Sequence, residues 1–161
     1  MRNIVIGITE SHNAAAALIL DGVLVACIQE ERFRRMKNVG GFPRQVLEYF
    51  FKTYRIRPEE VSCLAVANLS PLNHFLWEER SDVGGRGVSL AGQVMERLGY
   101  GREPLARKMR DSLDKAAVRF VFPQLRRKQI NEITEKTKIP AEKIRFVEHH
   151  AAHAWAAVYF L

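Results

Sequence analysis

Three short apolar runs open the chain. Asn3–Thr9 is a β-branched run, and Ala14–Leu20 and Val23–Ile28 are apolar runs of the length of buried strands. Asp21-Gly22, between the second and third runs, predicts a two-residue hairpin turn. Because the connections are short, the three strands are predicted to be antiparallel neighbours.

A helix and a further strand are predicted next. Gly40–Pro43 breaks the pattern, and Pro43 suits the first turn of a helix. Apolar residues at helical spacing follow at Val46, Leu47, Phe50, Phe51 and Tyr54. Val61–Ala67 is another strand-like run, and a strand, helix, strand order favours a parallel crossover.

The middle of the chain is predicted to be mostly helical. Ser81–Gly87 has the composition of a flexible loop, and Ser89–Leu98 is predicted to be a helix. A second helical stripe consists of Leu105, Met109, Leu113, Ala116 and Phe120. Pro123 breaks or restarts this pattern, and a third helix continues it through Leu125, Ile130 and Ile133.

The chain ends with a predicted turn, strand and helix. Lys138–Lys143 is the turn, Ile144–Val147 a short strand, and the alanine-rich stretch His150–Leu161 a helix. The whole order predicts an α/β fold with three antiparallel strands, then parallel strands, and a helical insertion at about residues 73–138. This order matches the ribonuclease-H-like lobe of the actin, hexokinase and Hsp70-type ATPase fold.

Composition is typical of one compact globular domain. The 161 residues are 47% hydrophobic and 27% charged, and no apolar run reaches the roughly 18 residues of a membrane span. The N-terminus lacks the apolar core and cleavage site of a signal peptide. Cys27 and Cys63 lie in strand-like runs and are predicted to be reduced core residues of a cytoplasmic protein.

The net charge of +7 is concentrated in Arg32–Lys37 and Arg102–Lys128. An excess of positive charge is compatible with binding to nucleic acid, phosphorylated ligands or acidic partners. Aromatic and basic residues do not interleave as in a platform for single strands, so solvated helix faces are favoured over a nucleic-acid partner.

Three of the five histidines lie close together in the sequence near the end of the chain. On a helix, the i, i+4 pair His149 and His153 shares one face and can share a metal ion, whereas His150 points about 100° away. Imidazole suits iron, zinc, copper or nickel, but two ligands do not complete a site, so a carboxylate from elsewhere would be needed. From the pattern alone, the favoured interpretation is that the two histidines contact only solvent or a carbonyl and bind no metal.

Two polar segments are further candidates. Glu10, Ser11, His12 and Asn13 lie between two buried strands, where they form either a ligand-binding turn or an ordinary Asx-type turn. The segment Glu30–Lys37 is rich in arginine, which grips phosphate or carboxylate, but its acids could equally pair with its bases. From composition alone, the structural network is favoured there.

Two separated segments carry a family resemblance. "GITESHNAAAALILDGVLVACIQEERFRRMKNVGGFP" and "VEHHAAHAWAAVYFL" resemble, in order and spacing, the N-terminal region of carbamoyltransferases of the nodulation-protein-U and cephamycin/tobramycin type. The resemblance implies the ATPase-type fold shared with the universal tRNA threonylcarbamoyl-transfer protein. It also implies an enzyme that makes carbamoyl-adenylate from carbamoyl phosphate and ATP, and passes the carbamoyl group to a hydroxyl of a small-molecule acceptor.

The same resemblance implies roles for individual residues. His149 and His153 match the family's metal ligands, with iron the expected ion. His12 would face the phosphates or the carbamoyl group as a hydrogen-bond donor, between Ser11 and Asn13 in the cofactor-binding turn. The residues implied in the wall of the catalytic site are Glu30, Glu31, Arg32 and Lys37.

The sequence also departs from the family. Asn13 stands where aspartate is usual, and Asn38 where histidine is frequent, which puts catalysis in question. Family members are much longer, so the second lobe would follow Leu161, and the isolated chain is expected to be inactive. The alternatives are a tRNA threonylcarbamoyl-transfer-like enzyme, or a non-catalytic remnant that binds metal or pairs with another chain through its apolar C-terminal end.

Overall fold

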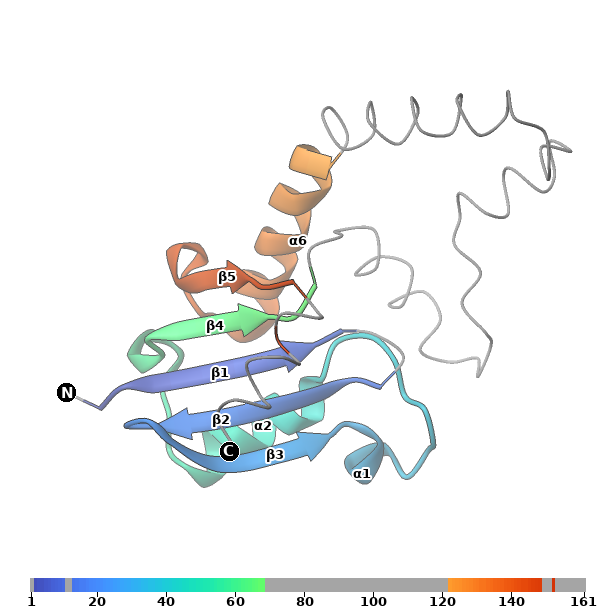
Figure 1. The fold of residues 1–161 in the computed structure, drawn as a ribbon, viewed down its shortest axis with the longest axis vertical. Helices are drawn as coiled ribbons and strands as arrows, with labels where there is room; N and C mark the ends of the chain where they lie inside the picture. The colour runs from blue at the N-terminus through green and yellow to red at the C-terminus, as the bar shows by residue number, and fades with distance from the viewer. Residues whose placement is uncertain (1, 11–12, 69–121, 149–151, 153–161) are drawn as a thin grey trace, which may run out of the picture.

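The computed structural model describes residues 2–10, 13–68, 122–148 and 152, which form a five-stranded mixed sheet in the order β3-β2-β1-β4-β5 (Figure 1). The strands are β1 Ile4–Thr9, β2 Ala15–Leu20, β3 Val23–Gln29, β4 Cys63–Val66 and β5 Ile144–Phe146. The first three strands are antiparallel neighbours, and β4 and β5 run parallel to β1. The predicted α/β class and the strand directions are therefore confirmed.

The predicted hairpin turn joins β2 to β3. Asp21 and Gly22 both have positive φ, 51° and 84°, as a type I′ turn requires. The turn is fixed to the start of β1, because Asn3 donates its backbone N–H to Asp21 Oδ1 at 2.7 Å and accepts the Asp21 N–H at 2.8 Å. The turn sets the register next to it, where Leu20 pairs with Val23, and the register of β2 with β3 then shifts between Leu18 and Ile19.

Within the described residues, three α-helices and two 3₁₀ turns accompany the sheet. The α-helices are α1 Glu31–Arg34, α2 Arg44–Thr53 and α6 Phe122–Thr137, and the 3₁₀ turns are η1 Pro58–Glu60 and η3 Ala141–Lys143. Helix α2 confirms the predicted stripe that begins at Val46, and α6 confirms the predicted third helix through Leu125, Ile130 and Ile133. The single-turn helix α1 was not predicted.

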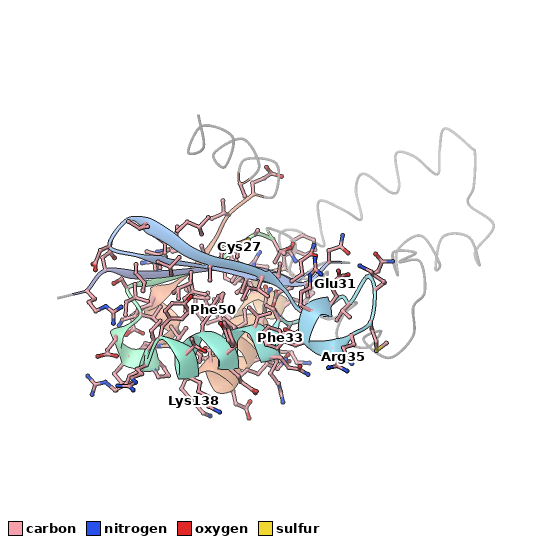
Figure 2. The ribbon with its side chains drawn as sticks, turned by 90° about the horizontal axis from the view of Figure 1, so that it is seen from below. Cys27, Glu31, Phe33, Arg35, Phe50 and Lys138 are labelled. Atoms are coloured by element: carbon pink, nitrogen blue, oxygen red, sulfur yellow. The ribbon has the colours of Figure 1, made fainter. Side chains whose placement is uncertain are left out.

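Both longer helices pack on the same face of the sheet (Figure 2). Side chains of β1, β2 and β4 alternate, and the buried set faces these helices. The core on this side contains Ile4, Ile6, Ile8, Leu18, Leu64 and Val66 of the sheet, Val46, Leu47 and Phe50 of α2, and Ile133 of α6. Helix α6 thus forms the crossover between β4 and β5 and belongs to the core, although it falls within the predicted insertion.

The cysteines correct one prediction. Both are free thiols, but Cys27 is exposed and Cys63 half-buried, so their placement in the core was wrong. The cause is strand alternation: both lie on the sheet face opposite α2 and α6. The alternation could not be recognised in the sequence, because in these runs the residues that face away from α2 and α6 are also apolar.

Several predictions lie outside the described residues. These are the loop Ser81–Gly87, the helix Ser89–Leu98, the stripe from Leu105 to Phe120, and most of the helix His150–Leu161. Of the helices in the described ranges, none is long and apolar enough to cross a membrane.

Candidate functional site at the carboxyl edge of the sheet

The polar segments singled out in the sequence meet at one edge of the sheet. Registers such as Thr9 with Ala15, and Ala15 with Gln29, bring the ends of β1 and β3 beside the start of β2. The parallel strands β4 and β5 end at the same edge (Figure 1). We call this the carboxyl edge, formed by Glu30, Asn13, Glu10, Asn68 and Glu148 in the order of their strands.

The width of this edge limits which residues can act together. Glu30 and Glu148 follow strands separated by four inter-strand spacings, which amounts to about 19 Å. The predicted metal ligands follow Glu148 directly in the chain. Glu30 therefore lies far across the sheet from Glu148, whereas Glu10 and Asn68 follow the strands between them.

Glu10 is buried at the centre of the carboxyl edge, 1% exposed at the end of β1. Its Oε2 accepts a hydrogen bond of 2.9 Å from Nε2 of the fully buried Gln129 in α6. Such a partner offsets part of the cost of burying a carboxylate. The bond ties the first strand to a helix far along the chain.

Arg126 extends this network along α6. Its Nη1 donates to Gln129 Oε1 at 2.8 Å, and a weaker contact of 3.4 Å reaches the Asn68 carbonyl. The guanidinium lies 3.6 Å from the ring centroid of Phe146 in β5, a cation–π distance. Burial lowers the pKa of Arg126, and attraction to Glu10 opposes that shift. One side chain thus links the ends of β4 and β5.

Glu30, predicted in the catalytic wall, makes structural contacts at the start of α2. Its carboxylate accepts the backbone N–H groups of Gln45 at 3.0 Å and Val46 at 3.1 Å, and Glu30 is only 3% exposed. The residue preceding α2 is Pro43, which has no side-chain acceptor, so a distant carboxylate supplies the cap. Glu30 also donates its own N–H to the Ala14 carbonyl, which fixes β3 beside β2.

Glu31 organises the following loop. It accepts hydrogen bonds from Lys37 Nζ at 3.2 Å and from the Asn38 backbone N–H at 3.3 Å. The Lys37 bond, with the Asn38 bond, lowers the pKa of Glu31 below its ordinary 4.5. Asn38 has φ 56°, a left-handed conformation that asparagine adopts more readily than most residues. The departure from the family pattern therefore occurs where the backbone favours asparagine.

The other predicted site residues are placed as follows. Asn13 is exposed two residues before the start of β2, and Arg32 is exposed on α1. Ser11, His12, His149 and His153 lie outside the described residues. Within the described ranges, no three metal-ligating side chains cluster together. The assignments of metal ligands and catalytic residues thus stay predictions.

Gln129 and Arg126 were missed in the sequence. A signal was present, because Gln129 is four residues before Ile133 on the buried side of the predicted third helix, where an apolar residue is the rule. A polar residue at a core position indicates a buried partner. The partner, Glu10, is 119 positions away and could not be read from spacing.

The fold and this edge define an α/β domain whose polar groups gather where parallel strands end, the usual ligand position of open α/β sheets. Residues 4–161 match the family model described as "Carbamoyltransferase N-terminus". The chain belongs to this carbamoyltransferase N-terminal family, as the resemblance indicated.

Individual relatives agree with the family match. Nodulation protein NolNO of Sinorhizobium fredii is 25% identical over 150 residues, covering 92% of this chain and 18% of that protein. The uncharacterized protein MJ1051 of Methanocaldococcus jannaschii is 32% identical over 65 residues, 40% of this chain and 12% of that protein. The uncharacterized protein sll1178 of Synechocystis is 48% identical over 50 residues, 31% of this chain and 8% of that protein. The matched regions span less than a fifth of the length of each of these curated relatives.

Proposed function

We propose that this chain forms the first lobe of an ATP- and carbamoyl-phosphate-dependent O-carbamoyltransferase. The lobe has the ribonuclease-H-like form of the actin, hexokinase and Hsp70-type ATPases. The reaction passes through carbamoyl-adenylate and transfers the carbamoyl group to a hydroxyl of a small molecule.

One observation carries the proposal. At a single sheet edge, the topology brings together described residues that adjoin the three segments marked by the family resemblance: Glu10 and Asn13 on either side of the first turn, Glu30 at the start of the Glu30–Lys37 segment, and Glu148 after β5. The local sequence does not require these segments to lie at one edge, because they are separated by a large part of the chain. Convergence at the carboxyl ends of parallel strands is what a ligand site between strands needs.

The residues proposed for the site divide into three groups. Asn13, with Ser11 and His12, would contact the nucleotide or carbamoyl group. Glu30 is a positioning residue, because both its oxygens bind backbone N–H groups of α2. Arg32 and Lys37 are exposed cations at the side of the site, where they would attract anionic substrates.

Iron is the proposed metal, with His149 and His153 as its protein ligands. The donor set fits, because imidazole nitrogen is a good ligand for iron. When bound, the ion would supply Lewis-acid stabilisation of phosphate oxygens. Arg126 would keep the ends of β4 and β5 in place, and the two histidines follow β5 in the sequence.

The activity is proposed for the complete protein. The matched relatives are much longer, and a nucleotide bound at an open sheet edge needs contacts from further chain. The 161-residue chain alone is therefore expected to show little or no transfer.

The test is formation of carbamoyl-adenylate by the full-length protein. With carbamoyl phosphate and ATP, mass spectrometry should detect carbamoyl-adenylate without any acceptor, together with pyrophosphate released from ATP and inorganic phosphate released from carbamoyl phosphate. Omitting carbamoyl phosphate is the control. A protein that binds ATP but forms neither carbamoyl-adenylate nor pyrophosphate under these conditions would refute the proposed reaction.

A tRNA threonylcarbamoyl-transfer-like role is the second candidate, supported by the net charge of +7. It requires tRNA binding that weakens steeply with salt, because phosphate contacts release counterions. Binding of tRNA with no such salt dependence, or no binding, would leave the small-molecule reaction as the better account.

A further inference from the structure

A pocket of about 280 Å³ opens beside the first turn of α2. Its charged lining comes from distant parts of the chain: Glu30 after β3, Arg34 in α1, Arg44 at the start of α2 and Lys136 in the last turn of α6. We call this the basic pocket. Because these residues belong to different elements, the tertiary fold creates the pocket and no single local motif does.

Positive charge dominates the lining of the basic pocket. Arg34, Arg44 and Lys136 supply three positive charges and Glu30 supplies one negative charge, so the lining carries a net charge of +2. Glu30 is only 3% exposed, and both of its carboxylate oxygens accept backbone N–H groups of α2. The N–H groups at the start of α2 are thus already bound by the protein itself. The cationic side chains, and not the helix terminus, define the chemistry of the pocket.

Phe42 and Gly41 shape the wall between the cations. The Lys136 Nζ atom lies 5.3 Å from the ring centroid of Phe42, a cation–π distance that helps to keep the ammonium group at the pocket. Gly41 has φ 89°, a conformation that favours glycine. Backbone without a side chain therefore forms part of the wall, where a ligand can approach closely.

We propose that the basic pocket binds the phosphate group of a small phosphorylated molecule. Guanidinium groups bind phosphate oxygens in a bidentate manner, and lysine adds a further point charge. A phosphate monoester carries a charge of about −1.5 to −2 at neutral pH, which balances the lining better than the single charge of a carboxylate does.

The size of the pocket limits the ligand further. Its volume of about 280 Å³ is just below the range of about 300–1,000 Å³ that is usual for sites of drug-sized ligands. A phosphorylated molecule with a short carbon chain therefore fits the pocket better than a whole nucleotide does.

Protection of Lys136 from acylation tests the proposal on the full-length protein. Lys136 is half-buried, and mass spectrometry measures how fast a trace of acetic anhydride labels it with and without inorganic phosphate. Phosphate at about three times its dissociation constant should slow labelling about fourfold, because only the unoccupied pocket reacts. Neither ATP nor carbamoyl phosphate is present, so the result does not depend on the carbamoyl-transfer reaction.

Lys52, which is exposed on α2, is the internal control, and its labelling rate should not change. Sodium chloride at equal ionic strength separates binding from screening. No protection of Lys136 at about 10 mM phosphate, ten times the dissociation constant of a weak site of about 1 mM, would overturn the proposal. Equal protection of Lys136 and Lys52, or equal protection by sodium chloride, would also overturn it.

Removal of single charges provides a second test with the same readout. Arg44→Gln should raise the dissociation constant of phosphate about tenfold or more, because a charged hydrogen-bond donor is lost. Arg34→Gln repeats the test at the other guanidinium. Arg127→Gln, at an exposed position of α6, is the matched control and should leave the constant unchanged. Circular dichroism identifies the variants that stay folded, and equal constants in these variants and the control would contradict the proposal.

The class of ligand is tested with glycerol phosphate, glycerol and formate. Glycerol phosphate should protect Lys136 at least as well as inorganic phosphate does, whereas neutral glycerol should not protect it. Formate that protects as well as glycerol phosphate at equal concentration would contradict the assignment of a phosphate ligand.

Discussion

Gln129 donates a hydrogen bond of 2.9 Å to Glu10, which joins the end of the first strand to the middle of the crossover helix α6. Both side chains are almost completely buried, 0% and 1% exposed. A carboxylate in such a position requires hydrogen-bond donors, and α6 supplies one only when it is docked on the sheet. The bond therefore couples assembly of the carboxyl edge to packing of the core.

Replacing Gln129 by leucine should destabilise the domain. The substitution keeps the approximate volume but removes a donor to Glu10 and an acceptor for Arg126. Leaving buried polar groups with fewer partners costs about 1–3 kcal/mol. Urea unfolding measures the loss, and Gln124→Leu, at an exposed position of the same helix, is the control. Equal stability of the two variants would contradict this role for Gln129.

Glu30→Ala should destabilise the start of α2. Two backbone N–H groups would lose their acceptor, and a helix-capping side chain contributes about 0.5–2 kcal/mol. Glu30→Gln keeps one carbonyl oxygen and should cost less. Chemical denaturation compares both with Glu48→Ala, which removes an exposed carboxylate from α2. If Glu30→Ala unfolds at the same urea concentration as Glu48→Ala, the capping role is wrong.

The Glu31–Lys37 pair should give stability that depends on pH. The folded pKa of Glu31 is lowered below its ordinary 4.5 by hydrogen bonds from Lys37 and Asn38. For a lowered carboxyl pKa, the contribution is present above the unfolded value and lost as pH falls through the folded value. Glu31→Gln should therefore reduce stability above pH 4.5 and matter progressively less below it.

Unfolding midpoints on both sides of pH 4.5 measure this effect. Lys37→Met should reproduce it, because it removes the principal donor to Glu31. A difference from wild type that stays constant as the pH falls well below 4.5 would show that the pair does not titrate as described.

Gly22→Ala should destabilise the hairpin between β2 and β3. Its φ of 84° is a conformation that residues with a Cβ rarely adopt, and forcing alanine into it costs about 1–2 kcal/mol. Space is not the cause, because a Cβ there would meet no atom within 4 Å. Thermal unfolding beside Gly7→Ala, which has equal space and no positive φ, isolates the conformational term. Equal loss in both variants would exclude it.

Local chemistry explains which parts of the fold could be predicted. The Asp21-Gly22 turn, the strand runs and the helical stripe beginning at Val46 depend on neighbours in the sequence, and the structure confirms all three. The short helix α1 was missed, because one turn carries no periodicity. The core placement of Cys27 was wrong, because an exposed cysteine on the sheet face opposite α2 and α6 looks like a core residue in sequence.

The candidate site depended more on tertiary structure. The sequence singled out the polar segments, but not that Glu30 caps a helix or that Gln129 reaches Glu10. Those bonds connect residues whose separation follows no rule of spacing. The family resemblance selected the same segments through motif order, and the sheet topology supplies a physical reason for their association.

The proposed metal site offers the most direct test of the central claim, that the carboxyl edge belongs to a metal-dependent carbamoyltransferase. The measurement is the iron content of the purified full-length protein and its single histidine variants. Wild type and His150→Ala should retain iron, whereas His149→Ala and His153→Ala should lose most of it. Equal iron content in all four proteins, or loss only in His150→Ala, would contradict the account.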